Sequence, residues 1–240
     1  MAESIAFGTL LVDRIGLTVA TRGAIQDQGV TTLTELSELD YDDIKNVVLN
    51  IMKYIAPGTP DVRVPYTSLK RLYAAKYWFA LRTRCGLPTL AAGLTNASLA
   101  TAQARRKEVD ERKAATKDQE LTKPPKLANF KDWVNWWELW DTYLQQLYGS
   151  ADVPLSYIYQ DHSTVTQEIR DADYNDEDER YQATTILSGR HFQLDNKRVW
   201  NELKPLVVDG PGWVFIKSLE GTKHGRNAVL TLQRLNEGEN

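Results

Sequence analysis

Cysteine is almost absent from this 240-residue sequence, which contains only Cys85. A disulfide framework and a cysteine-based zinc site are therefore excluded. No apolar run approaches the ~20 residues that are needed to cross a bilayer, so we expect no integral membrane protein. The N-terminal residues lack a basic leader and place Asp13 inside their apolar stretch. We therefore expect no secretory signal and a cytoplasmic location.

Residue patterns typical of catalysis or cofactor binding are also absent. The sequence contains neither of the glycine-rich phosphate-binding patterns, GxxxxGK[ST] and GxGxxG. Its histidines show no metal-ligand spacing and no nearby nucleophile pattern. We therefore expect a protein without catalytic, cofactor-binding or metal-binding residues, and without a small-molecule substrate. The histidines are His162, His191 and His224.

One acidic segment begins like a calcium-binding loop. Asp171, Asp173 and Asn175 stand at positions 1, 3 and 5 of such a loop. Position 6 is Asp176 where the loop requires glycine, and position 12 is Gln182 where it requires a bidentate glutamate. The segment is therefore interpreted as an acidic turn that caps the helix after it.

Tryptophan and charge are both unevenly distributed. Six of the seven tryptophans lie in the second half of the sequence, and only Trp78 lies in the first. Residues 1–130 contain 18 Lys and Arg against 14 Asp and Glu, whereas residues 131–240 contain 11 against 18. This asymmetry indicates two regions with different surfaces, of which the basic one is suited to a polyanion. Surfaces that only keep the chain soluble explain the same charges equally well.

The first region is predicted to consist of helices joined by tight turns. A brief helix from Thr21 is expected to stop at Gly29. A long helix is expected from Tyr66 to Cys85, and Cys85 is interpreted as a small packed residue. Its basic face is either solvated or in contact with phosphate. That face carries Lys70, Arg71, Arg82 and Arg84.

The middle of the chain is expected to separate two domains. Residues 96–113 have high helix propensity and almost no apolar stripe, which predicts a solvent-exposed or bridging helix. Residues 116–129 contain Pro124-Pro125 and have the composition of a linker. We therefore predict an N-terminal helical domain at 1–95, a polar helix and linker at 96–129, and a C-terminal helical domain at 130–240.

The second region opens with a strongly amphipathic segment. Trp133, Trp136, Trp137 and Trp140 step by three and four, as expected for a helix with a buried stripe. Stacking on nucleic-acid bases is the other interpretation of this stripe, and the spacing favours a core. Residues 153–159 are predicted to pair as a short strand or to pack in an extended form. A further helix is predicted over residues 195–208, and the fold class is mainly α.

Residues 130–240 contain an ordered set of short motifs, which are Phe130, Trp133, Trp137, Pro154-Leu155-Ser156-Tyr157, Ala183-Thr184, Leu187-Ser188-Gly189, Phe192, Asp195-Asn196, Val199-Trp200, Leu203-Lys204, Asp209 to Trp213, Gly225-Arg226 and Ala228-Val229-Leu230. This set resembles the Gag-like capsid region of copia-type LTR retrotransposons, of the diatom and algal type. Through Leu33, Leu36 and Asp43-Ile44, residues 1–95 resemble the helical N-terminal segment of the same proteins, and they also resemble sterile-alpha-motif or helix-hairpin-helix modules.

This resemblance implies two small helical domains of retroviral-capsid type, joined by a proline-containing linker. It also implies a structural protein, of which many copies form a virus-like shell that packages element RNA. Gag proteins of such elements commonly carry a CCHC zinc knuckle after the capsid region, and a sequence with one cysteine contains none. The competing hypothesis is a non-enzymatic helical adaptor that binds a partner protein.

The predicted interaction residues follow from charge and aromatic content. Trp78 and Trp213 are the candidates for an assembly interface, because association surfaces favour large aromatic side chains. The candidate RNA-facing residues are Lys70, Arg71, Arg82, Arg84, Arg105 and Arg106.

Overall fold

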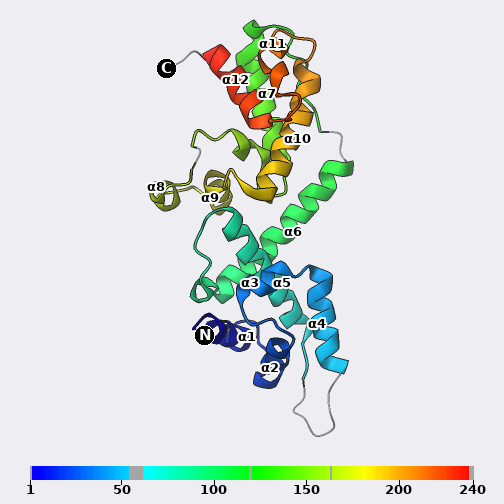
Figure 1. The fold of residues 1–240 in the computed structure, drawn as a ribbon, viewed down its shortest axis with the longest axis vertical. Helices are drawn as coiled ribbons and strands as arrows, with labels where there is room; N and C mark the ends of the chain where they lie inside the picture. Colours follow the sequence, from blue (N-terminus) through cyan, green and yellow to red (C-terminus); the bar gives the residue numbers. More distant parts are fainter. Residues whose placement is uncertain (1, 54–61, 119–120, 163, 238–240) are drawn as a thin grey trace. The chain divides into compact units, whose positions relative to one another are not determined.

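The computed structural model describes residues 2–53, 62–118, 121–162 and 164–237 (Figure 1). Every regular element in these ranges is a helix. The extended pairing within them is one isolated antiparallel bridge between Tyr148 and Pro154. The prediction of a mainly α protein is therefore confirmed.

Contacts within the chain define two compact units. Unit 1 consists of Met1–Thr83 and Leu87–Glu108, and unit 2 consists of Arg84–Gly86 and Val109–Asn240. The first division falls at the end of helix α5 (Tyr66–Arg84), and the second falls inside helix α6 (Asn96–Asp118). The domain limits predicted from composition, at residues 95 and 130, remain a prediction.

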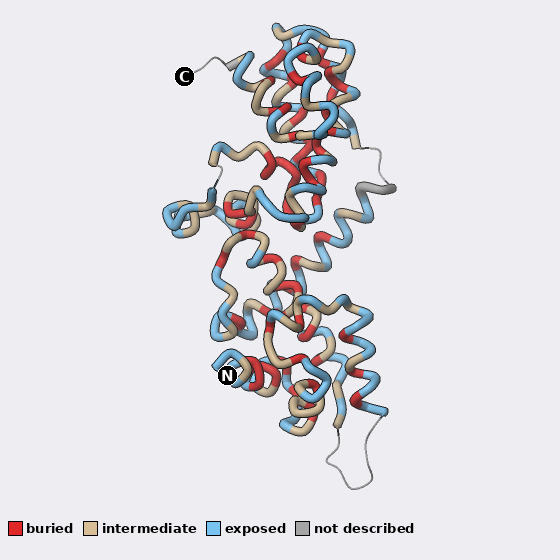
Figure 2. The backbone as a smooth tube through the Cα atoms, viewed as in Figure 1, coloured by how far each residue is buried: buried red, intermediate tan, exposed pale blue. Residues whose placement is uncertain are grey.

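Unit 1 is built from helices around an apolar core. Phe7, Leu11, Ile44 and Leu81 are almost completely buried in it, and Figure 2 shows buried residues on the inward sides of its helices. Helix α2 packs against both α1 and α4. Besides α5 and the first half of α6, the elements are α1 (Ala2–Asp13), α2 (Val19–Asp27), α3 (Leu33–Glu38), α4 (Tyr41–Lys53) and the 3₁₀ turn η1 (Ala91–Gly93).

Local sequence signals explain where these helices start and stop. The Thr32 hydroxyl accepts a hydrogen bond from the Glu35 backbone N–H at 3.1 Å, and the Glu35 carboxylate accepts one from the Thr32 N–H at 2.9 Å. This reciprocal capping box fixes the start of α3. Gly29, with φ of +87°, follows the end of α2. The helix stop predicted at Gly29 is therefore confirmed.

Unit 2 is a helical layer packed around tryptophan and tyrosine. Trp140, Tyr157 and Trp200 have at most 1% of their surface exposed. Helix α10 packs against α12, and the turn η3 contacts α7, α10 and α12. Besides the second half of α6, the elements are η2 (Phe130–Asp132), α7 (Trp133–Gln146), η3 (Leu155–Tyr159), α8 (Gln167–Asp171), α9 (Glu177–Thr184), α10 (Gly189–Val207), α11 (Trp213–Ile216), η4 (Lys217–Leu219) and α12 (Gly225–Glu237).

The predicted tryptophan stripe of α7 is confirmed as a core. The rings of Trp133 and Trp136 are stacked with centroids 5.6 Å apart, and those of Trp136 and Trp140 are stacked at 5.8 Å. All three side chains are buried. Trp137 lies at the edge of the stripe, where its ring contacts Tyr159 at 5.3 Å. These rings are therefore packed against one another and are not open platforms for bases.

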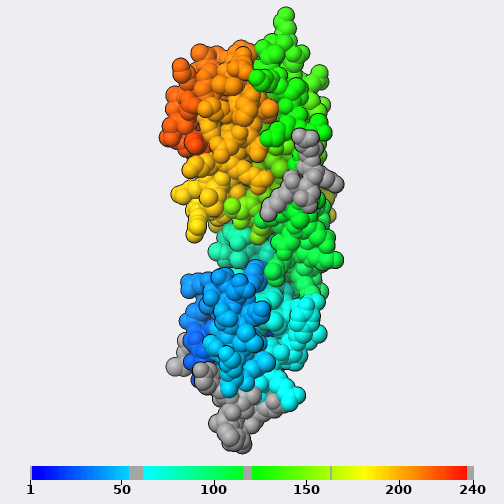
Figure 3. All heavy atoms as spheres, turned by 90° about the vertical axis from the view of Figure 1, so that its right-hand side faces the viewer, coloured from blue at the N-terminus to red at the C-terminus, as the bar shows by residue number. Residues whose placement is uncertain are grey.

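Residues 121–129, the described C-terminal part of the predicted linker, belong to unit 2 and pack against its helices. Leu127 is 1% exposed, and its backbone N–H donates to the Leu206 carbonyl at 2.8 Å. The Trp136 indole N–H donates to the Pro125 carbonyl at 2.7 Å. Figure 3 shows the green atoms of this end of unit 2 beside the orange atoms of the α10 region. Residues 119 and 120 of the predicted linker lie outside the described residues.

Helices α10 and α12 approach each other at a glycine. A Cβ atom built on Gly225, the first residue of α12, would lie 2.4 Å from the Asn196 carbonyl oxygen and 2.7 Å from the Trp200 backbone nitrogen. Both of these atoms belong to the backbone of α10. The first turn of α12 therefore rests directly on the neighbouring helix, and only glycine allows this approach.

A buried carboxylate joins α10 to the loop after α7. Asp195 is 1% exposed and accepts hydrogen bonds from the Ser150 N–H at 2.6 Å, the Ala151 N–H at 3.1 Å and the Tyr157 hydroxyl at 3.1 Å. The pKa of Tyr157 is raised above its ordinary value, mainly because the phenol is buried and secondly because Asp195 is negatively charged. This phenol therefore stays protonated and donates its hydrogen bond.

Two sequence-based element boundaries in unit 2 are corrected. Helix α10 begins at Gly189 and not at Asp195, and the Asp195 carboxylate lies inside the helix, where it accepts hydrogen bonds from another part of the chain. Residues 155–159 form the 3₁₀ turn η3 where a strand or extended segment was predicted. The acidic turn predicted before α9 is confirmed, since Asp176 caps that helix through the Glu179 N–H at 2.8 Å.

Candidate functional site

Two of the six predicted RNA-facing residues have exposed side chains. Lys70 lies over the ring of Tyr66, with its Nζ atom 4.6 Å from the ring centroid. Arg71 donates from Nη1 to the Arg14 carbonyl at 3.1 Å, which leaves the rest of its guanidinium at the surface. Both residues lie near the start of α5 in unit 1. They are the members of the predicted set that are accessible to a polyanion.

The other four predicted RNA-facing residues are bound to the protein itself. Arg82 donates to the Pro88 carbonyl at 2.6 Å and lies over the Trp78 ring. Arg106 lies 3.7 Å from the centroid of the Tyr41 ring. Arg105 is buried, with 8% of its surface exposed. Arg84, which belongs to unit 2, forms an ion pair with Asp152 at 2.7 Å. The structure therefore does not gather the six residues into one basic face.

The two predicted interface tryptophans have different environments. Trp78 is 6% exposed, so its ring belongs to the core of unit 1. Trp213 is partly exposed at the start of α11, where its ring packs against Trp200 with the centroids 6.2 Å apart. The Lys204 ammonium lies 5.8 Å from the Trp213 ring. Trp213 therefore connects the core of unit 2 to its surface, and the residues that follow it are more exposed.

Next to Trp213, unit 2 exposes an apolar surface that we call the apolar end surface. It consists of Phe130, Val134, Val214 and Phe215. Val134 and Val214 have 68% and 72% of their surface exposed, and Phe215 has 46%. The Phe130 and Phe215 rings join the two parts of the surface, with centroids 6.3 Å apart, and Val134 follows Phe130 by about one helical turn.

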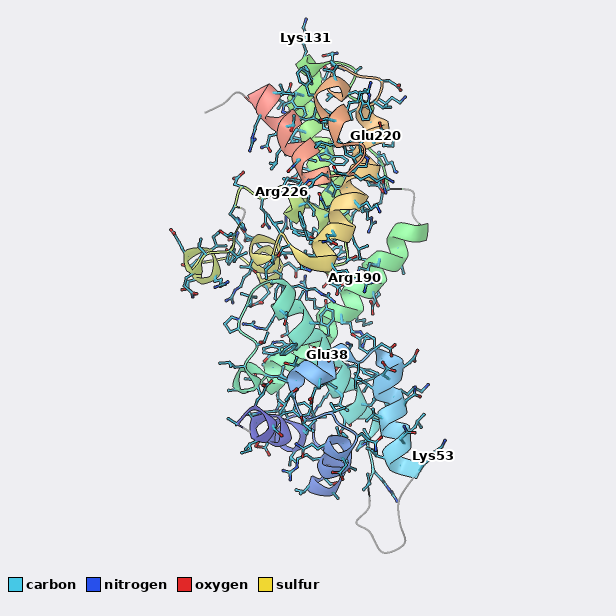
Figure 4. The ribbon with its side chains drawn as sticks, viewed as in Figure 1. Glu38, Lys53, Lys131, Arg190, Glu220 and Arg226 are labelled. Carbon is cyan, nitrogen blue, oxygen red and sulfur yellow. The ribbon has the colours of Figure 1, made fainter. Side chains whose placement is uncertain are left out.

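The apolar end surface is formed on tightly packed elements, and a charged side chain borders it. A Cβ atom on Gly212 would lie 2.8 Å from the Leu232 side chain and 3.7 Å from Phe130, so α11 is held tightly against α12 and η2. Lys131, between Phe130 and α7, is exposed and extends away from unit 2 in Figure 4. Exposed apolar patches with polar rims mark interaction sites in soluble proteins. This surface is therefore the candidate interaction site of unit 2.

Unit 1 has an apolar groove, which we call the unit 1 groove. Its volume is about 480 Å³. Leu90, with 73% of its surface exposed, stands at its edge, and Glu3 is its one charged lining residue. The lining comes from α1, α3, α5, η1 and the two residues before η1. It consists of Ala2, Glu3, Ala6, Phe7, Leu33, Thr34, Phe79, Thr89, Leu90, Ala91 and Ala92.

No group of three or more His, Cys, Asp or Glu residues suited to a metal ion occurs in the described part of the chain. The three histidines lie apart. His191 contacts the Ile186 carbonyl through Nε2 at 2.9 Å, and His224 accepts the Asn227 N–H at Nδ1 at 3.2 Å. His162 is partly buried.

Among the described helices, none is long and apolar enough to cross a membrane.

Lowering the pH from about 7.5 to 5 is expected to destabilise unit 2 through His191. Burial lowers the pKa of His191 below its ordinary 6.5. The unfolded chain therefore binds the proton more readily, so the stability is retained above pH 6.5 and falls as the pH drops through the lowered value. Urea unfolding at several pH values should show this loss, and His191→Gln should reduce it. Equal pH dependence in both proteins would contradict this assignment.

Sequence reasoning missed the apolar end surface, although a signal was present. Trp213-Val214-Phe215-Ile216 is an apolar run just after Gly210-Pro211-Gly212, and of its residues only Trp213 was predicted to form an interface. In a helix of four residues the four side chains point in different directions, so not all of them can be buried on one side.

Comparison with protein-family models, with curated proteins and with solved structures found no match.

Proposed function

We propose that this protein is a Gag-like structural protein without enzymatic activity. Many copies associate in the cytoplasm into a virus-like, capsid-type shell that packages retrotransposon RNA. The observation that carries the proposal is the apolar end surface, where Val134, Val214 and Phe215 remain exposed beside a well-packed core. The order of motifs shared with copia-type Gag-like capsid regions supports the same function.

Burial of the exposed apolar area favours association of copies. Each square ångström of apolar surface removed from water contributes about 25 cal/mol. Large apolar side chains at the centre of an interface also contribute disproportionately to affinity. Because α11 is fixed against α12 and Phe130, the apolar end surface is held in place before association. Little conformational entropy is therefore lost when a second copy covers it.

The division into two compact helical units also supports a shell protein. Copies in a closed shell occupy similar but not identical environments, and two separately packed units can adjust to them while each keeps its own core. Exposed Lys70 and Arg71 give unit 1 cations that can contact the phosphates of packaged RNA. RNA and further copies of the same chain are the proposed partners.

Assembly of the full chain tests the proposed function. We expect negative-stain microscopy and sedimentation to detect shells or curved sheets, with RNA present or absent, across a range of salt concentrations. The double variant Val134→Ser/Val214→Ser should raise the protein concentration needed for assembly by about tenfold, because it removes two exposed apolar side chains from the interface.

The matched control changes two exposed apolar residues outside the apolar end surface. Val19 and Leu194 have 62% and 50% of their surface exposed. Val19→Ser/Leu194→Ser should therefore assemble like the original protein. A discrete small species under all conditions would overturn the shell function. Equal loss in both double variants would show that the apolar end surface is not the interface.

A helical adaptor is the second candidate, and the unit 1 groove favours it. A groove of about 480 Å³ with mainly apolar lining has the size and character of a site for the side chains of a partner helix. An adaptor requires no self-association. The small discrete species that would overturn the shell function is the result that the adaptor function predicts.

A further inference from the structure

Unit 2 has a pocket that shares no lining residue with the apolar end surface. It has a volume of about 550 Å³ and lies between the beginning of α10 and the turn that precedes α12. The lining includes two lysines and a histidine and no acidic residue. The residues that line this donor-lined pocket are Leu187, Ser188, Gly189, Phe192, Gln193, Asn196, Lys197, Thr222, Lys223 and His224.

The cations of the donor-lined pocket are not neutralised by the protein. Within the part of the chain that the structure describes, neither Lys197 nor Lys223 has a carboxylate partner, and both side chains are exposed. By contrast, Lys113, Lys123, Lys126 and Lys204 of unit 2 each form an ion pair with a carboxylate, that of Lys204 with Glu220 being 2.5 Å long. Two unpaired ammonium groups on one pocket without carboxylates produce a positive potential that favours an anion.

A buried amide gives the donor-lined pocket a fixed donor. Asn196 is 8% exposed, and its Oδ1 atom accepts the Arg226 backbone N–H at 2.7 Å. That bond orients the side chain and assigns its other atom, Nδ2, as a donor. Among the described residues Nδ2 has no hydrogen-bond partner, although Asn196 lines the pocket. Because Asn196 lines the pocket, Nδ2 is an oriented donor that an acceptor group of a ligand in the pocket can reach.

The histidine contributes a further donor. His224 accepts the Asn227 N–H at Nδ1, so in the neutral ring the proton is on Nε2, which is a donor. Its ring meets the Phe192 ring edge to face, with centroids 6.5 Å apart. Phe192 is only partly buried and lines the pocket. An aromatic ring beside cationic and amide donors is an arrangement suited to a nucleotide, with phosphate on the donors and the base on the ring.

We propose that the donor-lined pocket binds the phosphate group of a nucleotide through Lys197, Lys223 and the Asn196 amide. The phosphate comes from a free nucleotide or from single-stranded RNA. The site does not depend on shell assembly, because all of its residues belong to unit 2 of one chain. It also lies outside the residues predicted from sequence to face RNA, all of which belong to α5 or α6.

Binding is measured on the full chain with three probes, uridine, uridine monophosphate and fluorescein-labelled hexauridylate. Calorimetry serves for the first two and fluorescence anisotropy for the third. We expect the phosphate-bearing probes to bind and uridine to bind at least about tenfold more weakly. Binding of the mononucleotide identifies a free nucleotide as sufficient, and binding of the hexanucleotide alone identifies the RNA backbone as the source. Uridine that binds as tightly as its monophosphate would overturn the proposal.

Two variants test the residues. Lys197→Glu/Lys223→Glu should weaken binding by about tenfold or more. Lys45→Glu/Lys53→Glu makes the same change in net charge on α4, with Lys53 labelled in Figure 4, and should leave binding within about twofold. Asn196→Asp keeps an oxygen for the Arg226 N–H and replaces the free donor by an acceptor, so it should also weaken binding. Circular dichroism of each variant verifies the fold, and equal affinities in the two lysine double variants would overturn the site.

Discussion

Replacing Gly225 by alanine is expected to lower the free energy of unfolding by about 3 kcal/mol. The added Cβ atom would lie 2.4 Å from the Asn196 carbonyl oxygen and 2.7 Å from the Trp200 backbone nitrogen. These are backbone atoms inside α10, so they cannot turn away as a flexible side chain would. Relief of the overlap requires α12 to move off α10, which disrupts the main helix contact of unit 2.

The sign of this effect separates packing from helix propensity. Alanine is favoured over glycine in a helix by about 1 kcal/mol, so propensity alone predicts that the variant is more stable. Gly221, in the preceding turn, has open space around its Cβ position, and Gly221→Ala should change stability by less than about 0.5 kcal/mol. Urea unfolding followed by tryptophan fluorescence measures both, since six of the seven tryptophans lie in unit 2. Equal stability of the two variants would refute the close approach.

Asp195→Asn is expected to reduce the free energy of unfolding by a similar amount, about 3 kcal/mol. The carboxylate accepts from two backbone N–H groups, of Ser150 and Ala151, and from the Tyr157 hydroxyl. Asparagine has nearly the same shape but offers one acceptor oxygen, and its NH₂ group would face donors. At least one buried donor is then left without a partner, in a site that is 1% exposed.

Two further variants assign the loss to these hydrogen bonds. Tyr157→Phe removes one of the three donors and leaves the carboxylate with the other two, so it should cost about 1 kcal/mol. Asp173→Asn makes the same chemical change at an exposed residue of unit 2 and should have little effect. Thermal melts of the three variants provide the measurement. A loss from Asp173→Asn as large as that from Asp195→Asn would indicate a general charge effect and not a buried network.

Regular spacing made the helical core of unit 2 predictable. Tryptophans three and four positions apart can share one face only in a helix, and Trp133, Trp136 and Trp140 are buried and stacked as that spacing requires. The end of α2 was predictable for a similar reason, because Gly29 readily adopts the positive φ that stops a helix. In both cases the determining interaction lies within a few residues of the signal.

Long-range partners explain what could not be predicted. The sequence predicts that a helix begins at Asp195, but this residue lies inside α10, which begins at Gly189, and its hydrogen-bond partners are 38 to 45 positions away. Similarly, the sequence reveals that Arg84 is basic but not that Asp152 neutralises it. The donor-lined pocket depends on the meeting of α10 with the turn at residues 222–224. No local pattern encodes such a meeting.

The single cysteine allows local opening of unit 2 to be measured by thiol labelling. Cys85 is 0% exposed, with its Sγ atom 3.6 Å from the Tyr181 carbonyl oxygen and 3.5 Å from the Thr185 hydroxyl. A thiol reagent in solution can reach it only after this packing separates. The rate of thiol labelling under native conditions therefore reports the fraction of molecules in which the segment around Arg84–Gly86 has separated from α9. Because no second thiol contributes to the signal, the intact chain allows this measurement without any engineered label.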